Sequence, residues 1–166
     1  MYVLRWSDDR SWGTDVPPVA GDLVAVPQGM TLLVDQNVLG ALQGIAVNNG
    51  TLIFCDEHNL EIHTGFIQVN GGRFIAGTES RPHTHDLTLV MYGDYYGAQL
   101  PTFGNKGIGC LDCKFSMYGR ERSVTWSELS ATANAGATTI TVENAGNWMT
   151  GESIVIASTS FNHYEA

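Results

Sequence analysis

Two histidines separated by one residue are the sharpest candidates for chemistry in this sequence, and they are His83 and His85. In an extended segment, residues i and i+2 point to the same face, so both imidazoles can ligate one metal ion. Glu79 and Asp86 lie close by in the sequence and are the carboxylates that would complete such a site. The competing interpretation is a surface loop after Gly77 that carries two histidines without binding a metal.

A second group of binding candidates lies on a long polar loop and just before the histidine pair. The loop covers residues 93–107, and a loop of this length is usually functional or mobile. Tyr95 and Tyr96 on this loop would present an aromatic platform to a sugar or a protein. Glu79 and Arg81 are the charged candidates for binding a ligand.

No catalytic motif accompanies these side chains. The sequence lacks G-x-S-x-G, H-E-x-x-H and a phosphate-binding glycine loop. Its 17 Asp and Glu residues include no pair whose spacing identifies the two carboxylates of glycoside cleavage. The net charge of -9 makes nucleic acid and anionic membrane surfaces poor partners. The residues favour a non-catalytic protein without a cofactor, apart from the metal considered at the histidines.

A repeat in the sequence predicts the fold that positions these residues. Val26, Val47 and Val69 recur at a nearly constant spacing, and a glycine-containing turn follows each valine. Cys110 follows Val69 at about twice this spacing, which we interpret as two periods, with residues 87–89 as the strand between them. A fixed period of this size is typical of a solenoid of stacked coils. We predict an all-β fold, a short right-handed parallel β-helix of four to five coils with capping segments; the alternative is a β-sandwich of paired strands.

The two ends of the chain add detail to this prediction. Residues 151–156 repeat the pattern of glycine, acid and alternating apolar residues found at 21–26, so we predict similar β-arcs at both places. Trp6 and Trp12 flank a polar segment that we expect to cap the first coil, because an open solenoid end exposes core and strand edges.

The cysteines and one sequon bear on the environment of the protein. Three cysteines leave at least one unpaired in an isolated chain, and the disulfide pairing stays open. Cys110 takes the place of the repeated valines and is predicted to face the core. Cys110 and Cys113 form C-x-x-C, but no second ligand pair accompanies it, so zinc is not favoured there. Asn49 begins an N-glycosylation sequon on the turn of the repeat, which favours secretion.

The ordered set of turns and strands resembles a G8 domain over nearly the whole chain. The pieces that carry the resemblance are Trp12, Pro18, Gly21-Asp22, residues 47–52, 67–74, 77–79, 87–89, 92–93, 104–106 and 117–119, Trp126, and residues 148–159. G8 domains occur in fibrocystin and fibrocystin-like receptors and in transmembrane and secreted hyaluronan-degrading proteins. The resemblance implies an extracellular, strand-rich module for which ligand binding is the usual proposal.

Two departures from the family pattern refine this resemblance. Asp112-Cys113 stands where the family commonly has Gly-Gly, so we expect that turn to bend differently. In the hyaluronan-degrading members, a large domain associated with catalysis interrupts the module after the position that matches Trp126, whereas this chain continues through Thr159 without an insertion. The continuous form is more similar to the fibrocystin and fibrocystin-like (polycystic kidney and hepatic disease 1-like) branch.

The resemblance implies that residues 1–166 are a single G8 domain excised from a larger extracellular protein, with a membrane-anchored, glycosylated parent. We predict a non-catalytic ligand-binding or interaction module whose extracellular ligand is unknown, with a carbohydrate as one candidate. It would dock end-on against a neighbouring β-helix domain, because the last coil has an unpaired edge. Contact with nucleic acid or directly with a membrane is not expected. The alternatives are an accessory part of a carbohydrate (hyaluronan)-degrading enzyme and a purely structural spacer.

Overall fold

The chain divides into two compact units, residues Met1–Arg120 and Glu121–Ala166. The computed structural model describes residues 3–13, 16–94, 96–97, 100 and 103–158. Within these residues the helical structure is one short 3-10 turn, η1 (Asp9–Ser11). No helix in this part of the chain is long and apolar enough to cross a bilayer.

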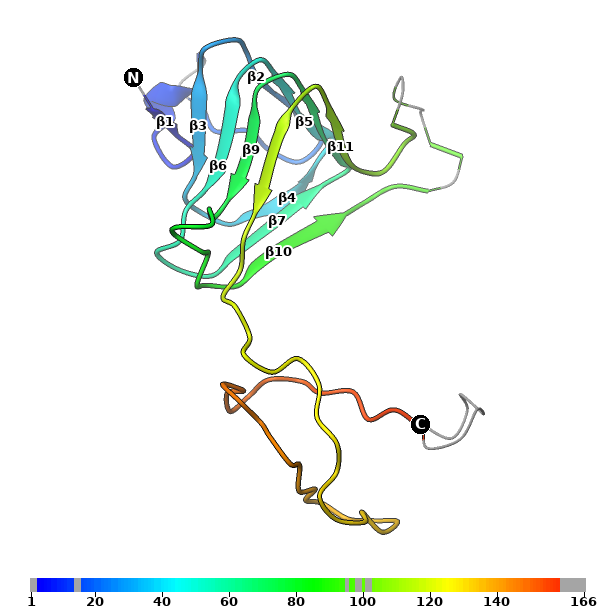
Figure 1. Cartoon of the computed structure of the whole chain (residues 1–166). Coiled ribbons are helices and arrows are strands. Elements are labelled where there is room, and N and C mark those ends of the chain that lie inside the picture. Colours follow the sequence, from blue (N-terminus) through cyan, green and yellow to red (C-terminus); the bar gives the residue numbers. More distant parts are fainter. Residues whose placement is uncertain (1–2, 14–15, 95, 98–99, 101–102, 159–166) are drawn as a thin grey trace. The chain divides into compact units, whose positions relative to one another are not determined.

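The first unit consists of short strands that form three sheets (Figure 1). In spatial order, sheet A contains β1 (Val3–Arg5), β3 (Thr31–Val34), β6 (Thr51–Phe54), β9 (Arg73–Ala76) and β12 (Lys114–Met117). Sheet B contains β11 (Gly107–Leu111), β8 (Phe66–Asn70), β5 (Gly44–Asn48) and β2 (Leu23–Val26). Sheet C contains β10 (Leu87–Met91), β7 (Leu60–Thr64) and β4 (Val38–Leu42).

From β2 onward the chain passes through the sheets in the fixed order B, A, C, and then begins the next passage (Figure 1). The passages are β2–β4, β5–β7, β8–β10 and the incomplete last passage β11–β12. Every ladder between the named strands is parallel, for example β5 with β8 and β6 with β9. The prediction of an all-β fold is confirmed, and the parallel strands in three sheets are compatible with a solenoid.

The register of the strands follows the repeat that the sequence shows. Val26 pairs with Val47, Val47 with Val69, and Val69 with Cys110. The three valines are buried in one core because alternate residues of each strand face inward. In sheet A the inward column runs through Leu32, Leu52, Phe74 and Phe115. Phe74 and Phe115 stack, with ring centroids 4.5 Å apart.

The interpretation of residues 87–89 as the next copy of the Val69 strand is wrong. These residues belong to β10, which pairs with β7, so that Leu87 lies beside Leu60. The direct pairing of Val69 with Cys110 means that the chain between them makes one passage, lengthened by the loop that follows β10. Spacing alone cannot distinguish two short coils from one coil with an insertion, because only hydrogen bonding between strands defines which strands are neighbours.

The turns between sheets B and A share a left-handed backbone residue. Asn49, Gly71 and Asp112 have φ values of 54°, 62° and 48°. Asp112 keeps the left-handed φ of Gly71, but Cys113 is not among the described residues with positive φ, unlike Gly72, so the turn bends differently at its second residue. Gly72 has φ of 75°, and a Cβ atom there would lie 2.1 Å from the carbonyl oxygen of Gly50 on the neighbouring passage. The close approach of two backbones, together with the positive φ, requires glycine at this position.

The prediction for Cys110 is right in register and wrong in burial. Cys110 pairs with the buried Val69, so it lies on the inward side of its strand, but it is exposed because no described strand of the first unit covers the last passage. It forms a disulfide with Cys113. The two Cα atoms are 5.6 Å apart across the turn that links β11 to β12. Cys55 is the free cysteine among the described residues, and it is buried in the core.

Residues before β2 cover the first passage, as predicted. Trp6 is 1% exposed and belongs to the core, and its ring packs edge-on against Trp12 at a centroid distance of 5.1 Å. The indole nitrogen of Trp12 donates a hydrogen bond to the carbonyl oxygen of Trp6. Ser7 donates from its amide and its hydroxyl to the two carboxylate oxygens of Asp35, at 2.9 and 2.8 Å.

The second unit is held by polar contacts rather than by ladders of strands. Leu129 and Val142 form an isolated antiparallel bridge. The side chain of Asn147 accepts from the amide of Ser123 and donates to the carbonyl of Glu121. The β-arc predicted at residues 151–156 is not formed: Ile154, Val155 and Ile156 are 50%, 96% and 53% exposed. A strand pattern produces a strand only where a neighbouring strand supplies hydrogen bonds, and the described part of this unit contains none beside it.

Candidate functional site

The histidine pair lies in the segment that joins β9 in sheet A to β10 in sheet C. Gly77 begins this segment with φ of 78°, and a Cβ atom there would lie 2.4 Å from the carbonyl oxygen of Tyr118. The amide of His83 donates to that carbonyl at 2.7 Å. The guanidinium of Arg120 donates to the carbonyl of Thr84 at 2.8 Å. Residues that follow β12 therefore hold the segment in place.

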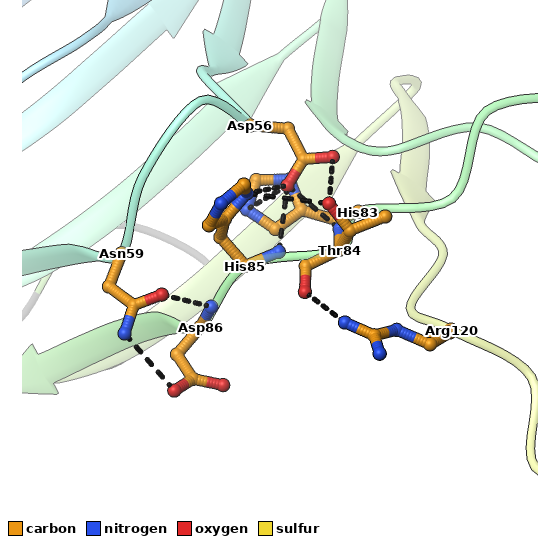
Figure 2. Close-up of polar contacts among 7 residues, drawn as sticks. All are labelled: Asp56, Asn59, His83, Thr84, His85, Asp86 and Arg120. Carbon is orange, nitrogen blue, oxygen red and sulfur yellow. Dashed lines mark hydrogen bonds and ion pairs between the residues drawn. The ribbon is translucent and has the colours of Figure 1, made fainter. Parts of the chain in front are cut away.

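The carboxylate of Asp56, which belongs to the preceding passage, lies at the centre of a group of polar contacts (Figure 2). We call this group, defined by Asp56, His83, Thr84 and His85, the corner. Oδ1 of Asp56 accepts from the amides of Thr84 and His85, at 2.7 and 2.8 Å, and its Oδ2 accepts from the hydroxyl of Thr84 at 3.0 Å. The two imidazoles face the same carboxylate (Figure 2): Nε2 of His83 and Nδ1 of His85 lie 3.6 and 3.1 Å from Oδ1. The structure therefore brings the two histidines together, and the group that both of them meet is Asp56.

The electrostatics of the corner depend on these hydrogen bonds. Burial alone raises the pKa of Asp56, but the hydrogen bonds donated by His85 and Thr84 outweigh it and hold the pKa well below its ordinary value of 3.8. The side chain of His83 is only 6% exposed, against 40% for His85. Neither ring nitrogen of His83 has a hydrogen-bond partner among the described residues.

The donor atoms of the corner are largely committed to the backbone. Within the described residues, no three His, Cys, Asp or Glu side chains are grouped so as to hold a metal ion. Asp86, one of the two carboxylates considered for such a site, instead exchanges hydrogen bonds with Asn59, at 3.0 and 3.3 Å (Figure 2). The hydrogen bonds of the corner therefore connect one passage to the next. The metal at the histidine pair stays a prediction, and the described residues do not supply a third ligand for it.

The other residues predicted to bind a ligand or carry a glycan make no described contact with Asp56. Glu79 and Arg81 are exposed in a tight turn that Thr78 and Arg81 close with two backbone hydrogen bonds, of 2.9 and 3.1 Å. Tyr96 is 92% exposed, and Tyr95 lies outside the described residues. Asn49 is exposed on its turn, where a glycan would reach solvent, and its glycosylation stays a prediction.

Asp56 was not found from the sequence, although a signal for it exists. Asp35 and Asp56 are separated by one period of the repeat, and each follows a strand of sheet A. Each also accepts from the amide and the hydroxyl of one residue, Ser7 for Asp35 and Thr84 for Asp56. The partner of Asp35 precedes it in the sequence, whereas the partner of Asp56 follows it. The repeat alone therefore does not predict the partners.

A second constellation lies on the outer face of sheet C. Nε2 of His63 is 2.5 Å from Oε1 of Glu61, and Nδ1 of His63 is 2.9 Å from the hydroxyl of Tyr92. The His63 and Tyr92 rings are in contact, with centroids 5.4 Å apart. Glu61, His63 and Tyr92 thus form one row of polar contacts on this face of the sheet.

Comparison with known proteins places the chain in a family. The profile described as G8 domain matches residues 11–130. This chain belongs to the G8 domain family. It is similar to fibrocystin-L of Mus musculus, with 36% identity over 100% of the chain and 4% of that protein. It is also similar to fibrocystin of Canis lupus familiaris, with 32% identity over 95% of the chain and 4% of that protein.

Relatives outside the animals carry the same module. A G8 domain-containing protein of Dictyostelium discoideum is 28% identical over 96% of the chain and 15% of its own length. The chain thus spans a small fraction of each of these relatives, and no solved structure matches it. The G8 family and the fibrocystin branch predicted from the ordered motifs are confirmed.

Proposed function

We propose that residues 1–166 form a non-catalytic, extracellular interaction module of a longer receptor-like protein. In this proposal the G8 domain is a short right-handed parallel β-helix of four coils, and its last coil binds an adjoining β-structured domain of the same protein. The parallel ladders support a β-helix over a sandwich, whose sheets are antiparallel. The small share of fibrocystin-L and fibrocystin that the chain covers supports a longer parent.

The observation that carries the proposal is that residues of the last passage are exposed although they pair with buried core residues of the passage before it. Ile108, Phe115 and Met117 pair with the buried residues Ile67, Phe74 and Ala76. They point inward by register, yet they are 40%, 43% and 53% exposed. We call this surface, defined by Ile108, Phe115 and Met117, the open end.

A partner with β structure fits the open end better than a helix does. The strands β10, β11 and β12 are edge strands of their sheets, so their outer N–H and C=O groups have no neighbour among the described strands of the first unit. Another strand layer would satisfy these groups and bury the apolar column in the same step. Obligate contacts of this kind resemble a domain core divided in two.

Hydrogen exchange tests the proposal. Amides of residues 107–117 are compared between the 166-residue chain and a longer form of the parent protein that contains the adjoining domain. We expect exchange at these amides to be at least ten-fold slower in the longer form, because the edge becomes paired. Met117→Asp should abolish this protection, whereas the matched control Leu23→Asp, at a residue 52% exposed on β2, should retain it. Equal exchange rates in the two forms would contradict docking and favour the spacer alternative.

A further inference from the structure

The three sheets of the first unit differ in the charges that their strands carry. The strands of sheet A contain Arg5, Arg73 and Lys114 and no Asp or Glu. The strands of sheet C contain Glu61 and no Lys or Arg, and those of sheet B contain no charged residue. The protein has 17 acidic and 8 basic residues, so strands whose charged residues are all basic differ from what the composition alone would give.

Two of these cations are neighbours on the outer face of sheet A. Arg73 and Lys114 are directly paired in the register of β9 and β12, so their backbones are about 4.8 Å apart. Both are exposed and point outward, because Phe74, the next residue of β9, faces the core. Like charges at directly paired positions destabilise a sheet.

No carboxylate among the described residues forms an ion pair with either cation, in contrast to Arg5, which lies 3.4 Å from Asp35. Asp112 is only two residues from Lys114, but it lies in the turn before β12 and makes no such pair. Two like charges at paired positions with no carboxylate to compensate them are a local conflict of the kind expected at functional sites.

The side chains next to the cations define what else the ligand needs. Thr51 pairs with Arg73 on the neighbouring strand and adds a hydroxyl to the same row. Ile53 and Ile75 form the adjacent outward row and are half-buried. The surface thus combines two cations, a hydroxyl and an aliphatic strip.

We propose that this surface, defined by Thr51, Ile53, Arg73, Ile75 and Lys114, binds an oxyanion group of an acidic saccharide. A carboxylate or sulfate between the two cations accepts charge-assisted hydrogen bonds and removes their repulsion. The aliphatic strip packs against the C–H face of a sugar ring, and the hydroxyl of Thr51 exchanges hydrogen bonds with a sugar hydroxyl.

An acidic peptide fits this surface less well. The backbone groups of β9 are already paired with β6 and β12 on its two sides, so the face offers no main-chain partners. A peptide on this face therefore cannot add the main-chain hydrogen bonds that give strand addition its affinity, whereas the acid and hydroxyl groups of a saccharide are recognised by side chains alone. The inference goes beyond the proposed docking of the module, because it uses the outward face of sheet A rather than the open end.

Thermal unfolding of the 166-residue chain tests the site with defined probes. Sodium sulfate is compared with sodium chloride at equal ionic strength, followed by a uronic-acid disaccharide, a sulfated disaccharide, a neutral disaccharide and a tetraglutamate peptide. We expect both acidic disaccharides at saturating concentration to raise Tm by about 2–4 °C, because a ligand that binds the folded state stabilises it. The neutral disaccharide and the peptide should leave Tm unchanged.

Charge-removing variants assign the effect to the paired cations. Arg73→Gln and Lys114→Gln should each lose the shift, and the matched control Lys106→Gln, at an exposed lysine outside sheet A, should keep it. Without ligand at low salt, Arg73→Gln should not lower Tm, because it removes a repulsion. A shift that persists in both variants, or an equal shift with the peptide, would overturn the proposal. Met117→Asp should keep the saccharide shift, so failure of docking at the open end and failure of this site give different results.

Discussion

The first unit ends differently at its two extremes, although both are built from the same repeated strands. At the β2 end, Trp6 is 1% exposed and is locked by Trp12 and by the hydrogen bonds between Ser7 and Asp35. At the open end, Phe115 and Met117 continue the core columns but are 43% and 53% exposed. The strand pattern therefore directs side chains inward at both ends, and only residues outside the repeat decide whether they are covered.

Truncation of one aromatic residue at each end gives the largest contrast. Trp6→Ala should lower the free energy of unfolding by about 3–5 kcal/mol, because it leaves a cavity in a closed region. Phe115→Ala should lower it by about 1 kcal/mol, because nearly half of that side chain is already in water. Urea unfolding followed by circular dichroism measures both. Equal losses would show that the two ends are covered to the same extent.

The turns between sheets B and A give an intermediate effect inside the stack. Gly72→Val should cost about 1–3 kcal/mol, because the residue has positive φ and its Cβ would collide with the backbone of the neighbouring passage. The control Arg73→Val changes an exposed, outward-facing residue and should have little effect on Tm in the absence of ligand. If both variants melt at the same temperature, the register of the stacked turns is wrong.

The smallest change in stability is expected from Asp56, whose hydrogen bonds connect two passages. The pKa of Asp56 is lower in the folded state than its ordinary value of 3.8, so its contribution to stability is present above that value and is lost as the pH falls below it. Between about pH 5 and about pH 2, the wild type should therefore lose more stability than Asp56→Asn. Denaturant midpoints across this range measure the difference, and Asp86→Asn serves as the control for removal of a nearby carboxylate. Parallel curves for the wild type and Asp56→Asn would show that the Asp56 carboxylate does not contribute to the pH dependence of stability.

Much of the fold follows from local patterns. The spacing of Val26, Val47 and Val69 predicted both the strands and their register, because the two-residue period of a strand fixes which side chains share a core. The pattern was less informative where the repeat is interrupted. The segment between Val69 and Cys110 contains an insertion, and only pairing in space shows that Leu87 belongs beside Leu60.

The candidate site was predictable to a smaller degree. The sequence placed His83 and His85 together, since alternate residues of an extended segment share a face. It did not supply Asp56, which is distant from Thr84 along the chain and becomes its neighbour only when one passage stacks on the next. The pairing of Arg73 with Lys114 was hidden for the same reason, because the two residues are brought together by the ladder between β9 and β12.

The sequence by itself determined the strand-rich composition, the inward and outward alternation, and the G8 family, since all three are recorded in the order and type of residues along the chain. The tertiary structure alone decided which strands are neighbours, which carboxylate meets the histidines, and which core residues remain exposed. It also decided that residues 21–26 contain a strand and residues 151–156 do not, although their patterns agree. The physical reason is that a strand acquires hydrogen bonds and burial from its neighbours, and those neighbours are distant in the sequence.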